Sequence, residues 1–391
     1  MVGLLTPLKV YEIDPHGDIR HALTVHPVEP MGVYIEGHVQ EVASRFHETD
    51  PRDLGADPNV DLPWFLQDLK PAGFLGRAWL RAHPDLGFPT SLVRWTGDDV
   101  LRYATLYGTD LTGAFVLGPF ARDRLRDEPF GGLINAGEEA RAFPALAERA
   151  REGAHGSLTG GEQPKFTATL QDGDQVRQHI VKFSPPLDTP GGRRWADLLL
   201  AEHLTHQVLA DHGIPAARSR LLDAGRRRFL AVERFDRCGA NGRSGLCSLL
   251  PFDRQGVAGD LRRWSLVTQR LVDDGHLTRQ DHETVQWLEA FGHLIANTDM
   301  HLGNLSVHLR GTTITGLAPV YDMLPMFHAP RHGGELPTGV YQPDAELGVV
   351  PGSAREAALD LWNRVLSHSM VSEDFRDIGR TQRAVAEKAP S

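Results

Sequence analysis

The sequence predicts an α+β fold with two lobes, in which a mixed, strand-rich N-lobe precedes a mainly helical C-lobe. Three observations support this prediction. Residues 166–183 alternate apolar and polar side chains on either side of a turn, as in a β-hairpin. Residues 194–212 repeat apolar side chains at helical spacing, and most segments after about residue 245 show the same period. At 391 residues the chain is long enough to bury the cores of both lobes.

The part before the hairpin contains short strands and helices. The predicted elements are strands at 8–13 and 22–25, a turn at 15–18, loops and short helices over 50–92, and helices over 94–115 and 137–152. After the hairpin strands, 166–170 and 178–183, the prediction continues with a helix over 194–212, a strand over 229–236, and helices over 261–274, 281–297, 354–368 and 372–388. A connector at 233–240 joins the lobes, so we place the boundary at about residue 240.

Bulk properties exclude several classes of protein. The formal net charge of −10 argues against non-specific DNA binding, which requires a basic surface. No apolar run is long enough to cross a bilayer, and the N-terminus lacks the pattern of a secretory signal. The two cysteines, Cys238 and Cys247, have no metal-site or disulfide-framework spacing, which suits a reducing cytoplasm.

The most informative motif is the stretch from Asn297 to Val307. Asp299 and Asn304 are five residues apart and His301 lies between them, just before an apolar strand-like run. Phosphoryl transfer needs a carboxylate to orient the attacking hydroxyl and an oxygen ligand nearby to hold magnesium. Asp322 follows another apolar run eighteen residues after Asn304, where a second metal ligand would stand. These residues favour an ATP-dependent kinase, although each motif by itself is also found in surface turns and helix caps.

A basic residue and an acid in the predicted N-lobe complete this chemistry. Only five of the 41 basic residues are lysines, and Lys165 and Lys182 both lie in this segment. Glu202 falls on the apolar face of the helix with Trp195, where a carboxylate is costly unless it is paired. We expect Lys182 to be its partner; the alternative is that Glu202 sits at the solvated edge of this face.

A Gly-rich loop precedes the hairpin. It contains Ser157, Thr159, Gly160, Gly161 and Lys165. Paired glycines allow backbone amides to approach an anion, and the lysine can reach phosphate oxygens. The alternative is an ordinary Gly-rich connection to a hairpin. Six elements in one order (Gly-rich loop, strand Lys, helix Glu, connector, Asp/Asn loop, strand Asp) favour the nucleotide site.

These segments resemble the HipA family of bacterial serine/threonine kinases, which are toxins of toxin–antitoxin systems. The resemblance covers about residues 130–385 and is carried by 157–165, 180–183, 232–237, 298–307 and 317–322. Residues before 130 resemble the YjjJ (HipH) subgroup through 62–69 and 73–77. The resemblance implies a HipA-like, protein-kinase-like or lipid-kinase-like fold with an N-terminal subdomain at 1–130, a nucleotide-binding N-lobe at 131–240 and a catalytic C-lobe at 241–391.

The resemblance also implies roles for individual residues. Asp299 would orient the substrate hydroxyl, with His301 either catalytic or shaping the loop, while Asn304 and Asp322 would hold Mg²⁺. ATP would be bound by Ser157, Thr159, Gly160, Gly161, Gln163, Lys165, Lys182, Glu202 and the backbones of Glu233 and Phe235. Ser157, or Thr159 beside it, would be the site of autophosphorylation. The loop is one residue longer than the family pattern, because Gly161 and Glu162 stand where one residue is expected.

The resulting prediction is a cytoplasmic, ATP- and Mg²⁺-dependent serine/threonine protein kinase of the HipA toxin type. Its partners would be a protein substrate, such as a translation factor or aminoacyl-tRNA synthetase, and an antitoxin. The helix-turn-helix of YjjJ-type proteins is not visible, which together with the acidic charge argues against direct DNA binding. Two alternatives stay open: a small-molecule kinase of the aminoglycoside type, and a catalytically silent nucleotide-binding or DNA-associated regulator.

Overall fold

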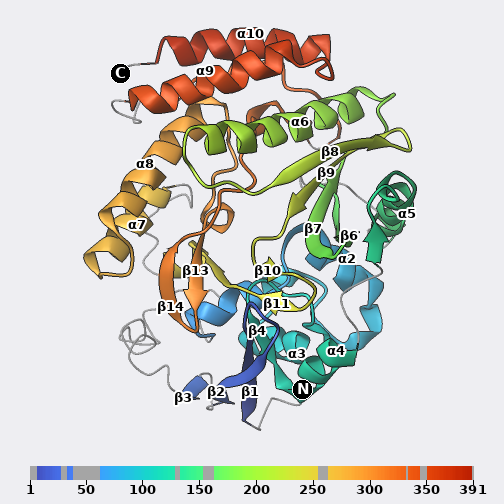
Figure 1. Cartoon of the computed structure of the whole chain (residues 1–391), viewed down its shortest axis with the longest axis vertical. Helices are drawn as coiled ribbons and strands as arrows, with labels where there is room; N and C mark the ends of the chain where they lie inside the picture. Colours follow the sequence, from blue (N-terminus) through green and yellow to red (C-terminus); the bar gives the residue numbers. More distant parts are fainter. Residues whose placement is uncertain are drawn as a thin grey trace.

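The computed structural model describes residues 7–27, 33–37, 62–127, 133–152, 163–253, 263–331, 333–343 and 350–389. Figure 1 shows a small sheet flanked by helices at one end of the molecule, a larger sheet in the middle and a set of long helices at the other end. No described helix combines the length and apolar character needed to cross a membrane.

The N-terminal part is built on a four-stranded sheet in the order β3-β2-β1-β4. Its strands are β1 (Leu8–Ile13), β2 (Ile19–Pro27), β3 (Val33–Gly37) and β4 (Phe115–Leu117). Its helices are η1 (Trp64–Leu69), α2 (Gly73–Ala82), α3 (Gly97–Tyr107) and α4 (Gly118–Asp127). The predicted helix over 94–115 is therefore too long. A capping box at Thr96 begins α3, and Phe115–Leu117 pairs with β1 instead of continuing the helix.

A five-stranded sheet in the order β5-β6-β7-β9-β8 forms the middle of the molecule. Its strands are β5 (Leu133–Asn135), β6 (Lys165–Asp172), β7 (Gln175–Phe183), β8 (Ser219–Ala224) and β9 (Arg227–Glu233). The turn between β6 and β7 contains only Gly173 and Asp174, and Gly173 has a φ of 57°, a conformation that favours glycine. The hairpin predicted from the alternating pattern is confirmed.

Two helices cover opposite faces of this sheet. One face carries an aromatic cluster of Phe166, Phe183 and Phe229 that packs against Phe143 of α5 (Glu139–Glu152). The other face presents Leu230 and Val232 to Leu199 of α6 (Pro190–Asp211), which begins at the Thr189 cap. Side chains on α6 are buried around most of its circumference, because it lies between the sheet and the C-terminal helices (Figure 1).

The C-lobe contains the predicted helices and, in addition, a sheet. Helices α7 (Trp264–Asp273), α8 (Arg279–Leu294), α9 (Gly352–Ser367) and α10 (Glu373–Glu387) agree with the sequence pattern within a few residues. A three-stranded sheet is formed by β12 (Gly245–Ser248), β13 (Ser306–Arg310) and β14 (Thr313–Leu317). The prediction that everything after residue 245 is mostly helical is wrong here, because β12 pairs with β13 from far along the chain.

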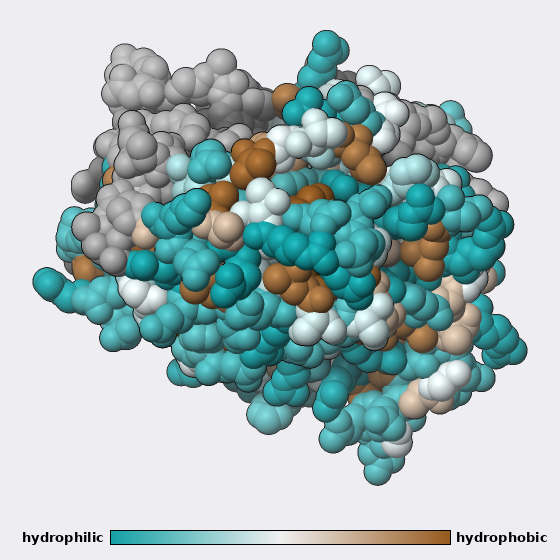
Figure 2. Space-filling model, turned by 90° about the horizontal axis from the view of Figure 1, so that it is seen from above, coloured by the Kyte–Doolittle hydropathy of each residue, from teal (hydrophilic) through white to brown (hydrophobic). Residues whose placement is uncertain are grey.

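The helices at the C-terminal end present a mainly polar surface. Viewed from above, the molecule is largely hydrophilic and its hydrophobic side chains form small separate patches (Figure 2). On α10, Arg380 pairs with both Glu373 and Asp377, and Arg383 pairs with Glu387. Such exposed pairs contribute little stability individually and mark a solvated face.

An ionic network, which we call the linker network, joins the N-terminal part to the connector after β9; its arginines and Asp236 are buried, whereas the Asp110 side chain is 33% exposed. The members of the network are Asp110, Arg234, Asp236, Arg237 and Arg243. Arg234 forms two hydrogen bonds to Asp236, each 3.0 Å long, and a third of 2.5 Å to Asp110. Arg237 bonds the same two carboxylates at 2.7 and 3.2 Å. The connector is thus held against residues more than a hundred positions earlier in the chain.

Candidate functional site

Three of the predicted site residues meet between the two lobes. The Nζ atom of Lys182, near the end of β7, lies 2.6 Å from Oε1 of Glu202 on α6 and also bonds the carboxylate of Asp322. The exposed fractions of Lys182 and Glu202 are 5% and 1%. The predicted pairing of Lys182 with Glu202 is confirmed, and the alternative of a solvated Glu202 is excluded.

Lys165 joins this group through the register of the hairpin. Residues directly opposite in an antiparallel pair point to the same face of the sheet, and Lys165 lies opposite Lys182. Their side chains therefore share the face of the sheet that lies toward Glu202 and Asp322, and the charge of Lys165 favours the ionised form of both acids. Two ammonium groups at the end of one hairpin form a suitable site for phosphate oxygens.

The charges of the three buried groups are interdependent. Burial by itself would lower the pKa of Lys182, but the carboxylates of Asp322 and Glu202 outweigh it and raise that pKa. The ammonium group holds the pKa of Asp322 well below its usual range despite burial. Burial and the charge of Asp322 raise the pKa of Glu202, because two acids share one close cation.

Asp322 has an unusual backbone conformation. Its φ is 52°, in the left-handed region that non-glycine residues seldom adopt. Two residues earlier, Val320 is fixed by two backbone hydrogen bonds, from its N–H to the Pro215 carbonyl and from Ala217 N–H to its own carbonyl. These bonds tie the segment to the loop after α6, so the strained residue is held from both lobes.

The loop after α8 positions Asp299 and Asn304. Asp299 is exposed, and its backbone N–H donates to the side-chain oxygen of Asn297 at 3.0 Å. The Asn304 amide nitrogen donates to the Asp299 carbonyl at 2.8 Å, which turns the amide oxygen of Asn304 the other way. The Asp299 side chain thus lies at the surface, and its role in orienting a substrate hydroxyl stays a prediction.

His301 shapes this loop. Its Nδ1 atom accepts a hydrogen bond of 3.1 Å from Gly303 N–H and so caps the short helix η5 (Leu302–Asn304). Trp264 of α7 donates its indole N–H to the His301 carbonyl at 2.9 Å. The imidazole is exposed, so the loop-shaping role suggested by the sequence has a structural basis without the ring being part of the core.

Two residues to which we assigned no role connect the loop to the segment of Asp322. Asn297, only 2% exposed, donates its amide N–H to the sulfur of Met323 while accepting from Asp299. The Tyr321 hydroxyl donates to the Gly303 carbonyl at 2.9 Å and therefore accepts from the Ser306 hydroxyl at 2.7 Å. Their positions immediately beside the two acids were the only sequence signal available, since the contacts themselves are non-local.

The side-chain oxygen atoms of Asp322 and Asn304 are of the kind that bind Mg²⁺. Mg²⁺ prefers oxygen ligands and is commonly held by one or two carboxylates together with substrate phosphates. Asp322 offers a carboxylate and Asn304 an amide oxygen, and Tyr321 holds their two segments together. No three His, Cys, Asp or Glu side chains of the described residues form a metal cluster by themselves. The oxygen atoms of Asp322 and Asn304 could therefore hold Mg²⁺ together with the phosphates of a nucleotide.

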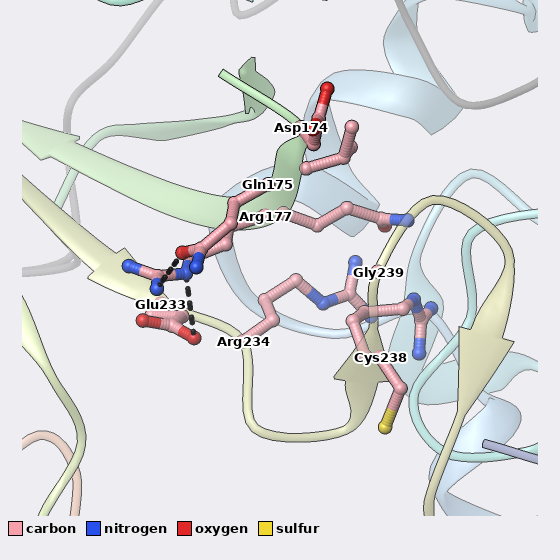
Figure 3. Close-up of a pocket in the computed structure, with 10 residues that line it drawn as sticks. Asp174, Gln175, Arg177, Glu233, Arg234, Cys238 and Gly239 are labelled. Carbon is pink, nitrogen blue, oxygen red and sulfur yellow. Dashed lines mark hydrogen bonds and ion pairs between the residues drawn. The ribbon is translucent and has the colours of Figure 1, made fainter. Parts of the chain in front are cut away.

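The residues predicted to contact adenine lie at the connector. Glu233 N–H donates to the Arg218 carbonyl at 2.8 Å, so this donor is used within the sheet, and contact of adenine with the backbones of Glu233 and Phe235 stays a prediction. Phe235 packs on Tyr321 with ring centroids 5.8 Å apart. A pocket of about 390 Å³ opens beside the connector, and Figure 3 shows Arg177 pointing toward Glu233 across it, their charged atoms 3.8 Å apart.

The Gly-rich loop is described only at its end. Gln163 donates its amide N–H to the carbonyl of Phe183, next to Lys182, which fixes the loop end to the strand that carries the lysine. Ser157, Thr159, Gly160 and Gly161, and with them the extra residue of the loop, lie outside the described residues.

Comparisons with known protein families match two parts of the chain. Residues 157–388 match the model of the HipA-like C-terminal domain, and residues 4–126 match that of the YjjJ-like toxin middle domain. Toxin YjjJ of Escherichia coli strain K12 is 36% identical over 325 residues, covering 82% of this chain and 73% of that protein.

Solved structures extend the comparison to the fold. The chain aligns with a structure of the HipA, HipB and operator DNA complex of Shewanella oneidensis MR-1 with a TM-score of 0.57 and 15% identity, covering 97% of this chain and 95% of the other. The kinase CtkA of Helicobacter pylori aligns with a TM-score of 0.33 and 13% identity over 60% of this chain and 93% of the other, too low to support an argument. The two-lobed HipA-like fold predicted from the sequence is confirmed, and the chain belongs to the HipA family as a member of its YjjJ-like toxin subgroup.

Proposed function

We propose that this protein is a toxin kinase that transfers the γ-phosphoryl group of ATP to a serine or threonine hydroxyl of a protein. The observation that carries the proposal is the buried contact of Lys182 with Glu202 and Asp322, opposite Lys165. A lysine paired with a helix glutamate beside a metal-binding aspartate is the arrangement that protein kinases use for ATP phosphates.

Each residue of the site has a separate role in the proposed reaction. Lys182 and Lys165 would bind phosphate oxygens, and Asp299 would orient the acceptor hydroxyl and accept its proton. The bond between the γ-phosphorus and the oxygen bridging to the β-phosphate breaks, a bond to the acceptor oxygen forms, and ADP leaves. Magnesium held by Asn304 and Asp322 would neutralise charge on the phosphates.

The pocket at the connector suggests where the other end of the nucleotide would lie. Gln178 lines this pocket and shares a face of β7 with Lys182, four residues away and thus roughly 13 Å along the strand. That distance suits a nucleotide whose phosphates contact Lys182 and whose base points toward the connector.

The decisive experiment compares Asp299→Asn with the wild type in the presence of radiolabelled ATP, magnesium and bacterial lysate. We expect protein phosphorylation to fall on the order of 10³-fold or more, because the carboxylate orients the nucleophile. Asp98→Asn, at an exposed acid of α3, is the matched control and should behave as wild type. Undiminished phosphorylation by Asp299→Asn would contradict the proposal.

The same assay separates the alternatives. Label on small molecules but not on protein would indicate a metabolite kinase, and binding of ATP without any transfer would indicate a silent regulator. Mass spectrometry of the protein after incubation with ATP and magnesium tests the proposed autophosphorylation of Ser157 or Thr159. Addition of a co-expressed antitoxin tests the partner suggested by the HipB-containing complex of the related HipA.

A further inference from the structure

A chain of polar side chains runs from the surface of α6 to the buried Glu202. Its members are Gln207, His203, Ser219 and His206. The side-chain amide of Gln207 contacts Nε2 of His203 at 3.0 Å, and Nδ1 of His203 contacts the Ser219 hydroxyl at 2.9 Å. The same hydroxyl contacts Nδ1 of His206 at 2.9 Å, and Nε2 of His206 lies 4.0 Å from Oε1 of Glu202.

Both histidines are neutral at physiological pH. Burial, with a smaller effect of the Lys182 charge, lowers the pKa of His206 to about 3. Burial also lowers the pKa of His203, helped by His368. Each ring therefore carries one N–H, and the partners of its two nitrogens decide which nitrogen bears it.

The direction of the chain follows from its first donor. The Gln207 amide nitrogen can only donate, so His203 accepts at Nε2 and carries its proton on Nδ1. His203 then donates to Ser219, and the single hydroxyl proton of Ser219 goes to Nδ1 of His206. His206 is left with its proton on Nε2, the atom that faces Glu202.

Two buried atoms at the end of the chain have no hydrogen-bond partner in the part of the protein that the structure describes, and the 4.0 Å between Nε2 of His206 and Oε1 of Glu202 is longer than a hydrogen bond. Nε2 of His206 and Oε2 of Glu202 have none among the described residues. The exposed fractions of these two residues are 4% and 1%, so solvent does not replace the missing partners. The Nε2–H group is consequently the dipole available to the Glu202 carboxylate besides the ammonium of Lys182.

We propose that His206 is a positioning residue that presents its Nε2–H to Glu202 and so holds the Lys182–Glu202 pair ready for ATP phosphates. Ser219 belongs to β8 and lies opposite Val232 of β9, so the chain also fixes α6 relative to the sheet that carries Lys182. This inference rests on the proposed kinase function for its consequence, whereas the tautomer of His206 is a property of the fold.

The first test is nitrogen-15 NMR of the histidines in the wild-type protein at neutral pH. We expect His206 to be the Nε2–H tautomer and His203 the Nδ1–H tautomer. An Nδ1–H tautomer at His206 would overturn the proposal whether or not the protein binds ATP. An inactive wild type with the expected tautomers would instead contradict the proposed function alone.

The second test compares His206→Leu, which removes the donor, with His206→Gln, whose amide nitrogen can replace Nε2–H. We expect His206→Leu to weaken binding of ATP with magnesium by about 2- to 10-fold, because a dipole 4.0 Å from the carboxylate contributes less than a direct hydrogen bond to a charge, and His206→Gln to restore most of it. His282 is a matched control, because its Nδ1 also meets a hydroxyl, that of Thr268, at 3.0 Å. Equal ATP binding by His206→Leu and His282→Leu, or no rescue by Gln, would overturn the positioning role.

Discussion

At the scale of single residues, Asp322 has a backbone conformation that destabilises the fold. Its φ of 52° costs roughly 1–2 kcal/mol for a residue with a Cβ atom. This backbone conformation places the Asp322 carboxylate beside Lys182.

Replacing Asp322 by glycine or alanine tests this interpretation. Both variants lose the carboxylate and should lose phosphoryl transfer, but Asp322→Gly should be more stable than Asp322→Ala by about 1 kcal/mol, because glycine relieves the strain. Urea unfolding of the two proteins measures the difference. Equal stabilities would show that the backbone relaxes and that the strain is small.

His328 predicts a dependence of stability on pH. Burial, reinforced by Arg194, lowers its pKa to about 4 from an ordinary value near 6.5. Between these values the unfolded chain binds a proton that the folded chain does not, so stability falls as pH drops from about 6.5 toward 4. Above pH 6.5 both states are neutral and the contribution is complete.

The variant His328→Leu should remove part of this dependence. Both ring nitrogens lack hydrogen-bond partners among the described residues, so the replacement breaks no side-chain hydrogen bond. Relative to wild type, the variant should gain roughly 2 kcal/mol on going from pH 7.5 to pH 5, as measured by urea unfolding. Parallel pH profiles for the two proteins would contradict the role of His328. His179, whose pKa is also lowered to about 4, retains its share of the dependence in both.

At the scale of helices and strands, the sequence predicted those elements whose signals are local. The β6–β7 hairpin has alternating side chains and a two-residue turn, and α8 begins at a Thr278 capping box. The strand β12 escaped prediction because its partner is β13, some sixty residues later. The helix over 94–115 was predicted too long because apolar periodicity does not show that Phe115–Leu117 pairs with β1.

The candidate site likewise contains residues whose roles the sequence predicts and residues whose roles depend on non-local contacts. Lys182 and Glu202 could be paired from the sequence because a buried carboxylate on an apolar helix face requires a cation. The roles of Asn297 and Tyr321 could not, because each depends on an atom that only the folded chain brings near. His206 stands four residues after Glu202 on the same helix, which the sequence shows, but its contact with Ser219 of β8 it does not show. That Glu233 N–H is used by the sheet could not be predicted either, because it depends on the position of the Arg218 carbonyl.

The packing of α8 against the loop of Asp299 gives an element-scale prediction. A Cβ atom at Gly292 would lie 2.1 Å from the sulfur of Met300, which is itself buried. Gly292→Ala should therefore destabilise the protein by about 1–3 kcal/mol and displace the loop, lowering transfer activity. Adding Met300→Ala should recover part of the loss in a double-mutant cycle of unfolding free energies. Additive effects would show that helix and loop are not coupled through this contact.

At the scale of the whole molecule, the linker network joins the N-terminal part to the connector. The pKa of Asp236 is lowered because Arg234 and Arg237 outweigh its burial, and its carboxylate also accepts from Gly113 N–H. Asp236→Asn would leave three buried guanidinium groups with Asp110 as the remaining acid of the network. We expect a loss of about 3–5 kcal/mol in unfolding free energy, the usual result of breaking a buried ion pair.

Denaturant unfolding followed by two probes measures the loss of unfolding free energy and shows whether the N-terminal part and the lobes unfold together. Asp123→Asn, which breaks the exposed pair with Arg122, is the control and should unfold as wild type does. If the network couples the N-terminal part to the lobes, Asp236→Asn should split a single transition into two. A single transition at unchanged denaturant concentration would show that the network contributes neither stability nor coupling.

The pairing of Lys165 with Lys182 restricts how this hairpin can evolve. One residue inserted in either strand between the two lysines would turn Lys165 toward the side covered by α5, away from Glu202 and Asp322. Two inserted residues would return it to the correct side but displaced by about 7 Å, too far to share a ligand with Lys182. Descendants of this gene can therefore vary the composition of the hairpin more freely than its length, and deletions there should be rarer than substitutions.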